Sequence, residues 1–275
     1  MAAARSFTEI QRMLVTRTDA SDGVRAIPEE TAIAFTYGSA TFAVMMATPE
    51  HIEDFAIGFS LTEGIIEHAS EITSLEIVPQ GNGIEARMLL AGARDEQLLS
   101  RRRRLAGVAG CGLCGIESLE AAVRPPRRIE SDLQIGADTI FAAIGSLREQ
   151  QHLNAATKAV HAAGFWSPTE AGFIAIREDV GRHNALDKLA GALACADVDA
   201  RNGFIMLSSR LSIELVQKAA TIGCPMLVAV SAPTNFALRA AEATGMTLIA
   251  VAREDSFEIF THRRRVVTAI PHEAR

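Results

Sequence analysis

The chain has 275 residues, more than the roughly 150 residues of an average domain, which predicts two domains or one large one. Apolar residues make up 48% and charged residues 22% of it, a composition that excludes a disordered tail, a collagen and a coiled coil. The formal net charge of -6 excludes general nucleic-acid binding, so any anion site has to be local. No apolar run approaches the ~20 residues of a membrane-spanning helix, and four cysteines are too few for a disulfide framework. We therefore expect a cytoplasmic protein with neither a membrane nor a nucleic-acid partner.

The first half of the chain predicts a mixed α+β domain. Residues 1–25 are expected to be a loose N-terminal segment, and the domain itself to span residues 26–130. Two β-rich runs joined only by Gly38 and Ser39 predict a hairpin. A cap at Thr48 and a proline at Pro49 predict the start of an amphipathic helix. The expected elements are strands at 31–37 and 40–46, a helix at 49–66, and strands at 75–78 and 84–90.

The second half alternates between helices and short apolar strands and predicts an α/β domain over residues 131–275. Such alternation favours a mostly parallel sheet with right-handed crossovers. Pro125 and Pro126 mark the preceding linker, at about 123–133. The expected helices are 137–150, 183–194, 211–221 and 234–244, and the expected strands are 172–176, 204–207, 226–230 and 247–251.

Cys111 and Cys114 form a Cys-x-x-Cys motif flanked by glycines, which leaves several chemistries open. Two thiols at this spacing can share a metal, form a disulfide or lower one another's pKa. Structural zinc needs a second ligand pair, and Cys195 and Cys224 fall in different predicted elements. A deaminase would combine the motif with a His-x-Glu such as His51-Ile52-Glu53, but that triplet lies in the predicted first helix. The glycine-rich setting also suits a thiolate that accepts a sulfur atom as a persulfide and hands it on, and the cysteines as merely small loop residues remain an alternative.

Polar residues follow three strands of the predicted sheet. Ligands of open α/β sheets bind beyond the carboxyl ends of the strands, and helix N-termini there favour phosphate groups. These positions are Ser208, Ser209 and Arg210, the segment from Ser231 to Asn235, and Arg253. Ordinary helix capping explains serine and asparagine at such places equally well.

The densest polar cluster runs from Arg177 to Lys188, between a strand and an apolar helix. Binding or proton transfer would explain so many polar groups, but Glu178, Asp187 and Lys188 could instead form solvated pairs on a helix surface. His161 lies among alanines and is either a core histidine or a site residue. The block from Arg101 to Arg104 is either a solvated helix face or an attractor for an acidic partner or a pyrophosphate.

Several segments, in this order, closely resemble the formate dehydrogenase accessory sulfurtransferase family, FdhD. They are Phe55–Ile66, Gly110–Gly115, Glu178–Leu189, and Ser208–Arg210 with Val216–Lys218. The resemblance implies a homodimeric sulfur carrier that takes sulfur from a cysteine desulfurase. Such a carrier is expected to deliver that sulfur to the molybdenum cofactor, bis-molybdopterin guanine dinucleotide, before the cofactor enters formate dehydrogenase. It also implies a second domain with the three-layer fold of cytidine deaminases but without their zinc.

The resemblance further implies a persulfide on Cys111, with Cys114 as its partner, and no resident metal. GDP or GMP would mimic part of the bound cofactor. The expected cofactor-binding residues are Asp179, Arg182, His183, Lys188, His161, Ser208, Ser209, Arg210, Ser231, Ile249, Ala250, Val251, Ala252, Arg253 and Glu254. Two other classes remain: a noncatalytic chaperone that only holds the molybdenum cofactor, and a zinc-binding interaction module.

Overall fold

The structure is a computed structural model, which describes residues 6–92 and 128–268. The predictions for Cys111, Cys114 and the block Arg101 to Arg104 lie outside these residues. The described strands are β1 Phe7–Val15, β2 Ala20–Pro28, β3 Thr31–Tyr37, β4 Ala40–Ala47, β5 Ile72–Gln80, β6 Gly83–Leu90, β7 Ile135–Gly136, β8 His161–Ser167, β9 Gly172–Asp179, β10 Phe204–Leu207, β11 Met226–Ala229, β12 Thr247–Ala250, β13 Glu258–Thr261 and β14 Val266–Val267. The described α-helices are α1 Ile52–Thr62, α4 Ala137–Gln150, α5 His152–Thr157, α6 Arg182–Cys195, α7 Ile213–Thr221 and α8 Asn235–Thr244.

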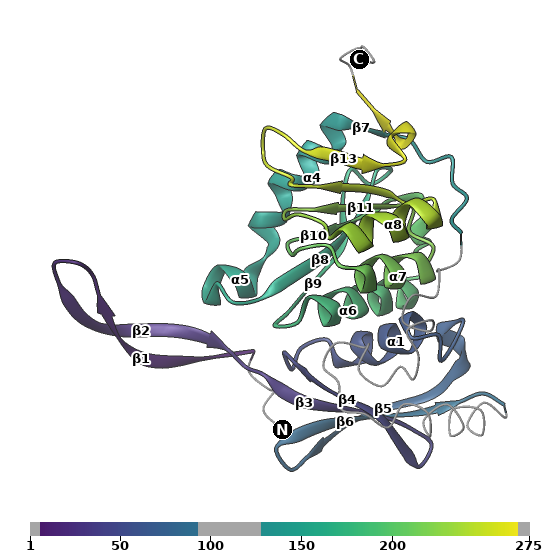
Figure 1. Cartoon of the computed structure of the whole chain (residues 1–275). Helices are drawn as coiled ribbons and strands as arrows, with labels where there is room; N and C mark the ends of the chain where they lie inside the picture. The colour runs from purple at the N-terminus through teal and green to yellow at the C-terminus, as the bar shows by residue number, and fades with distance from the viewer. Residues whose placement is uncertain (1–5, 93–127, 269–275) are drawn as a thin grey trace.

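Strands β3 to β6 form a sheet in the order β4-β3-β6-β5, and α1 packs on one of its faces (Figure 1). The predicted hairpin of β3 and β4 is confirmed, and Gly38 in its turn has a φ of 58° that favours glycine. Phe35 of β3 stacks on Phe59 of α1, with ring centroids 4.5 Å apart. Among the described residues, the members of this hydrophobic core all lie between residues 33 and 90.

The expected helix at 49–66 is shorter in the structure. Thr48 does not cap it: its N–H donates to Asp179 Oδ2 at 3.0 Å, and its hydroxyl accepts a hydrogen bond from the N–H of Val180. The residue before α1 is His51, in a left-handed conformation with φ 53°. The capping pattern was therefore misleading, because a contact with β9 uses the groups that a cap would need.

For residues 7–25, the prediction of a loose segment is wrong. Strands β1 and β2 pair from Phe7 with Pro28 to Val15 with Ala20, and this hairpin extends away from the rest of the molecule (Figure 1). Side chains such as Met13 and Val15 stay 67% and 68% exposed. Since no face of the hairpin is buried, its sequence lacks the alternation of apolar and polar residues by which strands are recognised.

The second sheet has the order β13-β12-β11-β10-β8-β9 among the described strands, and it is mixed. Only β10–β11 and β11–β12 are parallel pairs, whereas β8 runs antiparallel to β10 and to β9. The prediction of a mostly parallel sheet is therefore wrong, because β8 and β13 were not recognised. Strand β8 begins His-Ala-Ala-Gly, and its Gly164 has no space for a side chain, since an added Cβ would lie 2.8 Å from the Phe173 ring.

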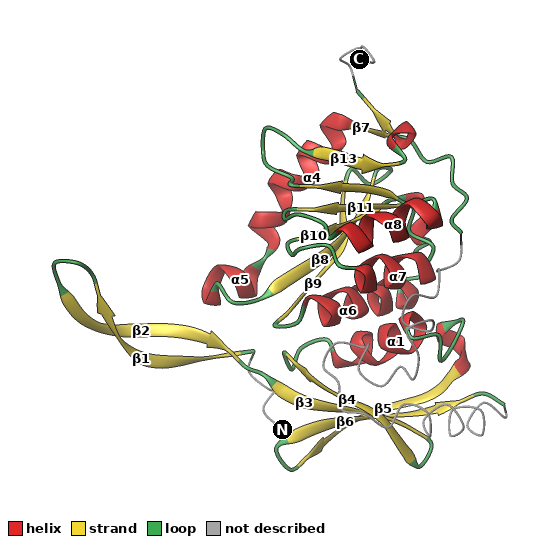
Figure 2. Cartoon of the chain, viewed as in Figure 1, coloured by secondary structure: helices red, strands yellow, loops and turns green. Residues whose placement is uncertain are grey.

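Helices cover both faces of this sheet (Figure 2). Helices α6, α7 and α8 share one hydrophobic core with it, and α4 shares a second core on the opposite face. Helix, sheet and helix thus form three layers. A specific likeness to cytidine deaminases, and the boundaries of the two domains, stay predictions.

Helices α1 and α6 join the two sheets through backbone contact (Figure 1). A Cβ added to Gly58 of α1 would lie 1.7 Å from the carbonyl oxygen of Asp187, and one added to Gly191 of α6 would lie 1.9 Å from that of Asp54. Only glycine permits such an approach. The contact with α1 therefore fixes the position of α6 relative to the first sheet.

Candidate functional site

Most of the predicted site residues lie at one edge of the six-stranded sheet. The parallel register pairs Leu207 with Ala229 and Val228 with Ile249, so β10, β11 and β12 end together. Strand β8 starts at this edge because it is antiparallel: the N–H of Ala162 donates to Ser208 Oγ at 2.8 Å. Beside it, the register pairs His161 with Asp179, the last residue of β9. The predicted residues whose backbone lies at this edge are His161, Asp179, Arg182, His183, Ser208, Ser209, Arg210, Ser231, Val251, Ala252, Arg253 and Glu254.

Arg182 and Arg210 make part of this edge positive. Burial lowers the pKa of His161, and the charges of Arg182 and Arg210 lower it further, so both guanidinium groups act on that ring. Arg210 is exposed. The Nε of Arg182 is buried and has no hydrogen-bond partner among the described residues. Because buried donors are normally paired, this nitrogen is available to an acceptor from a ligand or from water.

Backbone groups add to the same edge. Helices α6, α7 and α8 all start here, and their first N–H groups carry the partial positive charge of a helix N-terminus. Thr234 caps α8 by accepting from the N–H of Ala237 at 3.1 Å. Val251 has a left-handed φ of 52°, an unusual conformation for a β-branched residue.

Part of the predicted segment at the end of β12 does not face the edge. Ile249, Ala250 and Ala252 are buried in the hydrophobic cores, so only their backbone is available to a ligand. Arg253 donates from Nη1 to the carbonyl oxygens of Val230 and Ala252, which ties two strand ends together.

His183 belongs to a small polar group that the sequence did not reveal as such. Its Nε2 lies 3.5 Å from Ser212 Oγ and 3.9 Å from Glu214 Oε2, both near the start of α7. Burial and the neighbouring charge of Arg182 lower the pKa of His183 to about 4. The imidazole is therefore neutral at neutral pH. Ser212 and Glu214 follow the predicted Arg210 closely in sequence, but their pairing with His183 depends on two elements that are not adjacent in the chain.

Asp179 and Lys188 are placed inside the molecule. Their side chains are both 0% exposed and form an ion pair of 2.7 Å. Asp179 also accepts from Asn184 and from the N–H of Thr48, while Lys188 donates to the carbonyl oxygen of Thr48. In the structure this pair joins α6 to the chain before α1. A contact between these two residues and the cofactor stays a prediction.

A second buried ion pair joins the same two parts of the chain. Lys218 of α7 donates to Asp187 of α6 and to Glu63 at the end of α1, with distances of 2.9 and 2.7 Å. Thr62 donates to Asp187 Oδ1 at 2.6 Å. Burial raises the pKa of Asp187 to about 6, and the charge of Lys218 opposes that rise.

The predicted alternative of solvated surface pairs is therefore wrong for Asp187 and Lys188. Glu178 is also occupied by the fold, since it accepts from the N–H groups of Leu153 and Asn154 at the start of α5.

The described cysteines form no pair. Cys195 ends α6 and is exposed, and Cys224 precedes β11 and is buried, in the separate elements that the sequence predicted. Within residues 6–92 and 128–268, no three His, Cys, Asp or Glu side chains gather as they would around a metal ion. His51 and Glu53 flank the start of α1, and burial lowers the pKa of His51. Among the same residues no helix combines the length and the apolar composition needed to cross a bilayer.

Comparison with known proteins assigns the family. Residues 28–267 match the sequence model of the FdhD/NarQ family. The chain belongs to this family. Among its relatives in the family, the sulfur carrier protein FdhD of Agrobacterium fabrum is 49% identical over 263 residues, 95% of this chain and 97% of the relative. The sulfur carrier protein FdhD of Brucella abortus is 50% identical over 244 residues, 88% of this chain and 90% of the relative.

A solved structure shares the family fold. It is the crystal structure of a formate dehydrogenase accessory protein from Desulfotalea psychrophila, with a TM-score of 0.77 at 22% sequence identity. The match covers 96% of this chain and 100% of the other. The family model and the two sulfur carrier relatives confirm the resemblance to the FdhD family.

Proposed function

We propose that this chain is a cytoplasmic, homodimeric sulfur carrier in the maturation of formate dehydrogenase. Its relatives at up to 50% identity bear the name sulfur carrier protein FdhD, and they align over most of the chain. The donor in this proposal is a cysteine desulfurase that holds its sulfur as a persulfide. The acceptor is the molybdenum cofactor with its two guanine dinucleotides, which is a substrate rather than a resident group.

The observation that carries the proposal is the positive edge of the six-stranded sheet. The acceptor is rich in phosphate, and arginine pairs well with phosphate in a fork geometry. Arg182 and Arg210 lie at this edge, together with the N-termini of α6, α7 and α8. Ser208 and Ser231 follow the neighbouring strands β10 and β11 there. The residues present thus suit a phosphate-bearing ligand.

Sulfur transfer needs one nucleophilic thiolate, and we assign it to Cys111. Its thiolate attacks the outer sulfur of the desulfurase persulfide, a new S–S bond forms, and the desulfurase cysteine leaves as a thiolate. No net oxidation occurs in this exchange. Attack of the Cys114 thiolate on Cys111 Sγ then releases the outer sulfur as hydrosulfide for the molybdenum. The two electrons come from the cysteines, which become a disulfide.

Whole-protein mass spectrometry tests the sulfur step. After incubation with desulfurase and cysteine, the wild type is expected to gain the mass of one sulfur atom, and Cys111→Ala is expected to gain none. Cys114→Ala should keep the adduct for longer, because its release step is removed. A Cys114→Ala variant without any adduct would overturn the transfer mechanism and leave the noncatalytic chaperone.

Nucleotide binding tests the edge separately. GDP is expected to raise the melting temperature of the wild type, since a ligand of the folded state stabilises it. The rise should shrink in Arg182→Gln and Arg210→Gln. Arg148→Gln, which removes an exposed charge on α4, is the matched control and should keep the full rise. If neither GDP nor GMP shifts the wild type, the edge is not the nucleotide site.

A further inference from the structure

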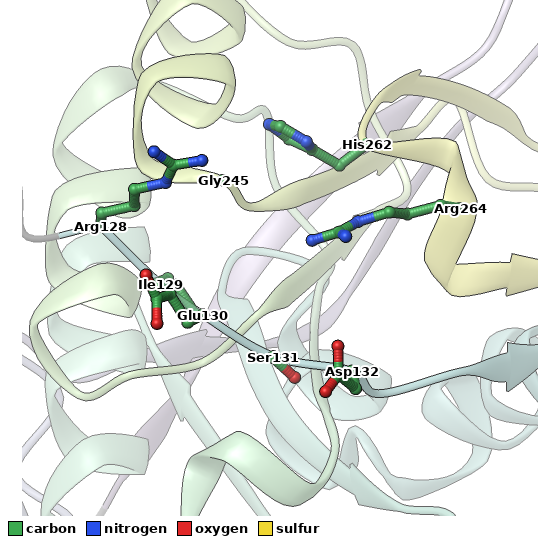
Figure 3. Close-up of a pocket in the computed structure, with 8 residues that line it drawn as sticks. All are labelled: Arg128, Ile129, Glu130, Ser131, Asp132, Gly245, His262 and Arg264. Atoms are coloured by element: carbon green, nitrogen blue, oxygen red, sulfur yellow. The ribbon is translucent and has the colours of Figure 1, made fainter.

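A hollow lies at the opposite edge of the six-stranded sheet, where β12 begins. It has a volume of about 600 Å³. Gly245, which precedes β12, and His262, which follows β13, both line it, so it opens at the end of β12 remote from Val251. Figure 3 shows Arg128, His262 and Arg264 around the hollow, with the segment from Ile129 to Asp132 as its other wall. Its volume falls in the range of small-molecule sites.

Two arginines at this hollow lack an acidic partner. Arg128 and Arg264 come from different segments, and no carboxylate of the described residues lies within ion-pair distance of either. Glu130 and Asp132 also line the hollow, but both are exposed to solvent. Water screens these carboxylates and the two arginines alike, because Arg128 and Arg264 are exposed as well.

A third arginine lies buried beneath the same wall. Arg265 is 1% exposed, and it donates to the carbonyl oxygens of two lining residues, Ser131 and Gly245, at 3.2 and 2.7 Å. Its Nη2 is buried without a hydrogen-bond partner among the described residues, and the charge of Asp132 acts on this guanidinium without a direct ion pair. Burial and the neighbouring charge of Arg264 lower the pKa of Arg265, so Asp132 offsets the cost of its buried charge only in part. An anion in the hollow would reduce that cost.

His262 adds a fixed polar side chain to the rim. Its Nε2 donates to the carbonyl oxygen of Glu242 at 3.1 Å, which orients the ring. The backbone of His262 is left-handed, with φ 42°. Such conformations are uncommon outside glycine and are often found at binding sites.

We propose that this hollow is a binding site for a phosphate-bearing small molecule. Arg128 and Arg264 would hold the phosphate oxygens, and the buried charge of Arg265 would add to the positive potential. The site is separate from the positive edge, where β10, β11 and β12 end. It does not depend on the sulfur carrier function proposed above.

Pyrophosphate is the probe for this site, measured by isothermal titration calorimetry. The titration uses the full chain carrying Arg210→Gln, a change that weakens any phosphate binding at the positive edge of the six-stranded sheet. We expect saturable binding of pyrophosphate with a stoichiometry of one, and weaker binding of inorganic phosphate. Adding Arg128→Gln and Arg264→Gln together should weaken binding at least tenfold. Adding Arg148→Gln, a matched exposed arginine on α4, should leave the affinity unchanged.

Chemical labelling gives an independent measurement. Phenylglyoxal modifies accessible arginines, and mass spectrometry reports each site. Pyrophosphate is expected to protect Arg128 and Arg264 but not Arg148. The proposal is overturned if pyrophosphate shows no saturable binding, if Arg148→Gln weakens binding as much as the double change, or if the labelling of Arg128 and Arg264 is insensitive to pyrophosphate.

Discussion

The contact between α1 and α6 differs from the positive edge of the six-stranded sheet in whether its charged side chains are paired. At the helix contact, Lys188 pairs with Asp179 and Lys218 with Asp187, and these lysines and aspartates are buried. At the edge, a few residues from Asp179 in the sequence, Arg182 keeps a buried nitrogen without a partner in the described part of the chain, and Arg210 is exposed. A satisfied charge network holds elements together, whereas unpaired cations are available to a ligand. Pairing, rather than the density of charge, separates structural residues from candidate site residues here.

Removing Lys218 should have the largest effect on stability. Lys218→Met leaves Asp187 and Glu63 without their cation, and breaking a buried pair costs about 3–5 kcal/mol of the free energy of unfolding. Urea denaturation measures this loss. The double variant Lys218→Met with Asp187→Asn should recover part of it, since it removes the stranded charge. Equal losses in the single and double variants would show that the pair is not coupled.

Filling the contact between α1 and α6 should lower the free energy of unfolding somewhat less. Gly58→Ala places a Cβ against the carbonyl of Asp187 and should destabilise by about 3 kcal/mol, as overpacking does. Gly145→Ala is the matched control, because it is also a helical glycine but its Cβ would meet no atom within 4 Å. That control should gain up to about 1 kcal/mol from helix propensity. A Gly58→Ala variant as stable as the control would contradict the close packing of α1 and α6.

The smallest expected effect concerns pH and His183. The pKa of this ring is lowered from 6.5 to about 4 in the folded chain, so the unfolded chain binds the proton more tightly. The stability that comes from a neutral His183 is therefore present above pH 6.5 and is lost as the pH falls toward 4. Between pH 7 and pH 5 this loss amounts to about 2 kcal/mol.

Comparing unfolding free energies at pH 7 and pH 5 tests this expectation. His183→Gln cannot be protonated, so it should lose about 2 kcal/mol less than the wild type over this interval. The rise in the pKa of Asp187 acts in the opposite direction, favouring the folded chain at low pH, and is shared by both proteins. Identical pH dependence in the two proteins would exclude a partly buried, neutral imidazole at this position.

Local sequence patterns predicted much of the fold. The helix at 137–150 and the strand at 204–207 agree with α4 and β10 to the residue, because a strong apolar period or a short buried run identifies such elements. The same patterns missed the β1–β2 hairpin, which buries no face, and β8, whose small residues look like a loop. The error in β8 had the greater consequence, since it turned a mixed sheet into a predicted parallel one.

The candidate site was predictable only as far as strand ends could be located. Ser208, Ser231 and Arg253 were predicted to lie together because they follow β10, β11 and β12, which are parallel neighbours in the structure. Asp179 and Lys188 were grouped with them, although their partner Thr48 lies 131 residues or more away in sequence. A dense polar cluster after a strand is common to ligand sites and to contacts between domains, and only the long-range partner distinguishes the two.

The glycines at the crossing of α1 and α6 have a mechanical consequence. Two backbones in direct contact, flanked by buried ion pairs, leave neither a water layer nor adaptable side chains along which the helices could slide. The two sheets should therefore move as one rigid body and lose their structure in a single cooperative step. Any displacement that carries an atom from a donor to an acceptor would then have to come from loops, not from a hinge between the halves of the chain.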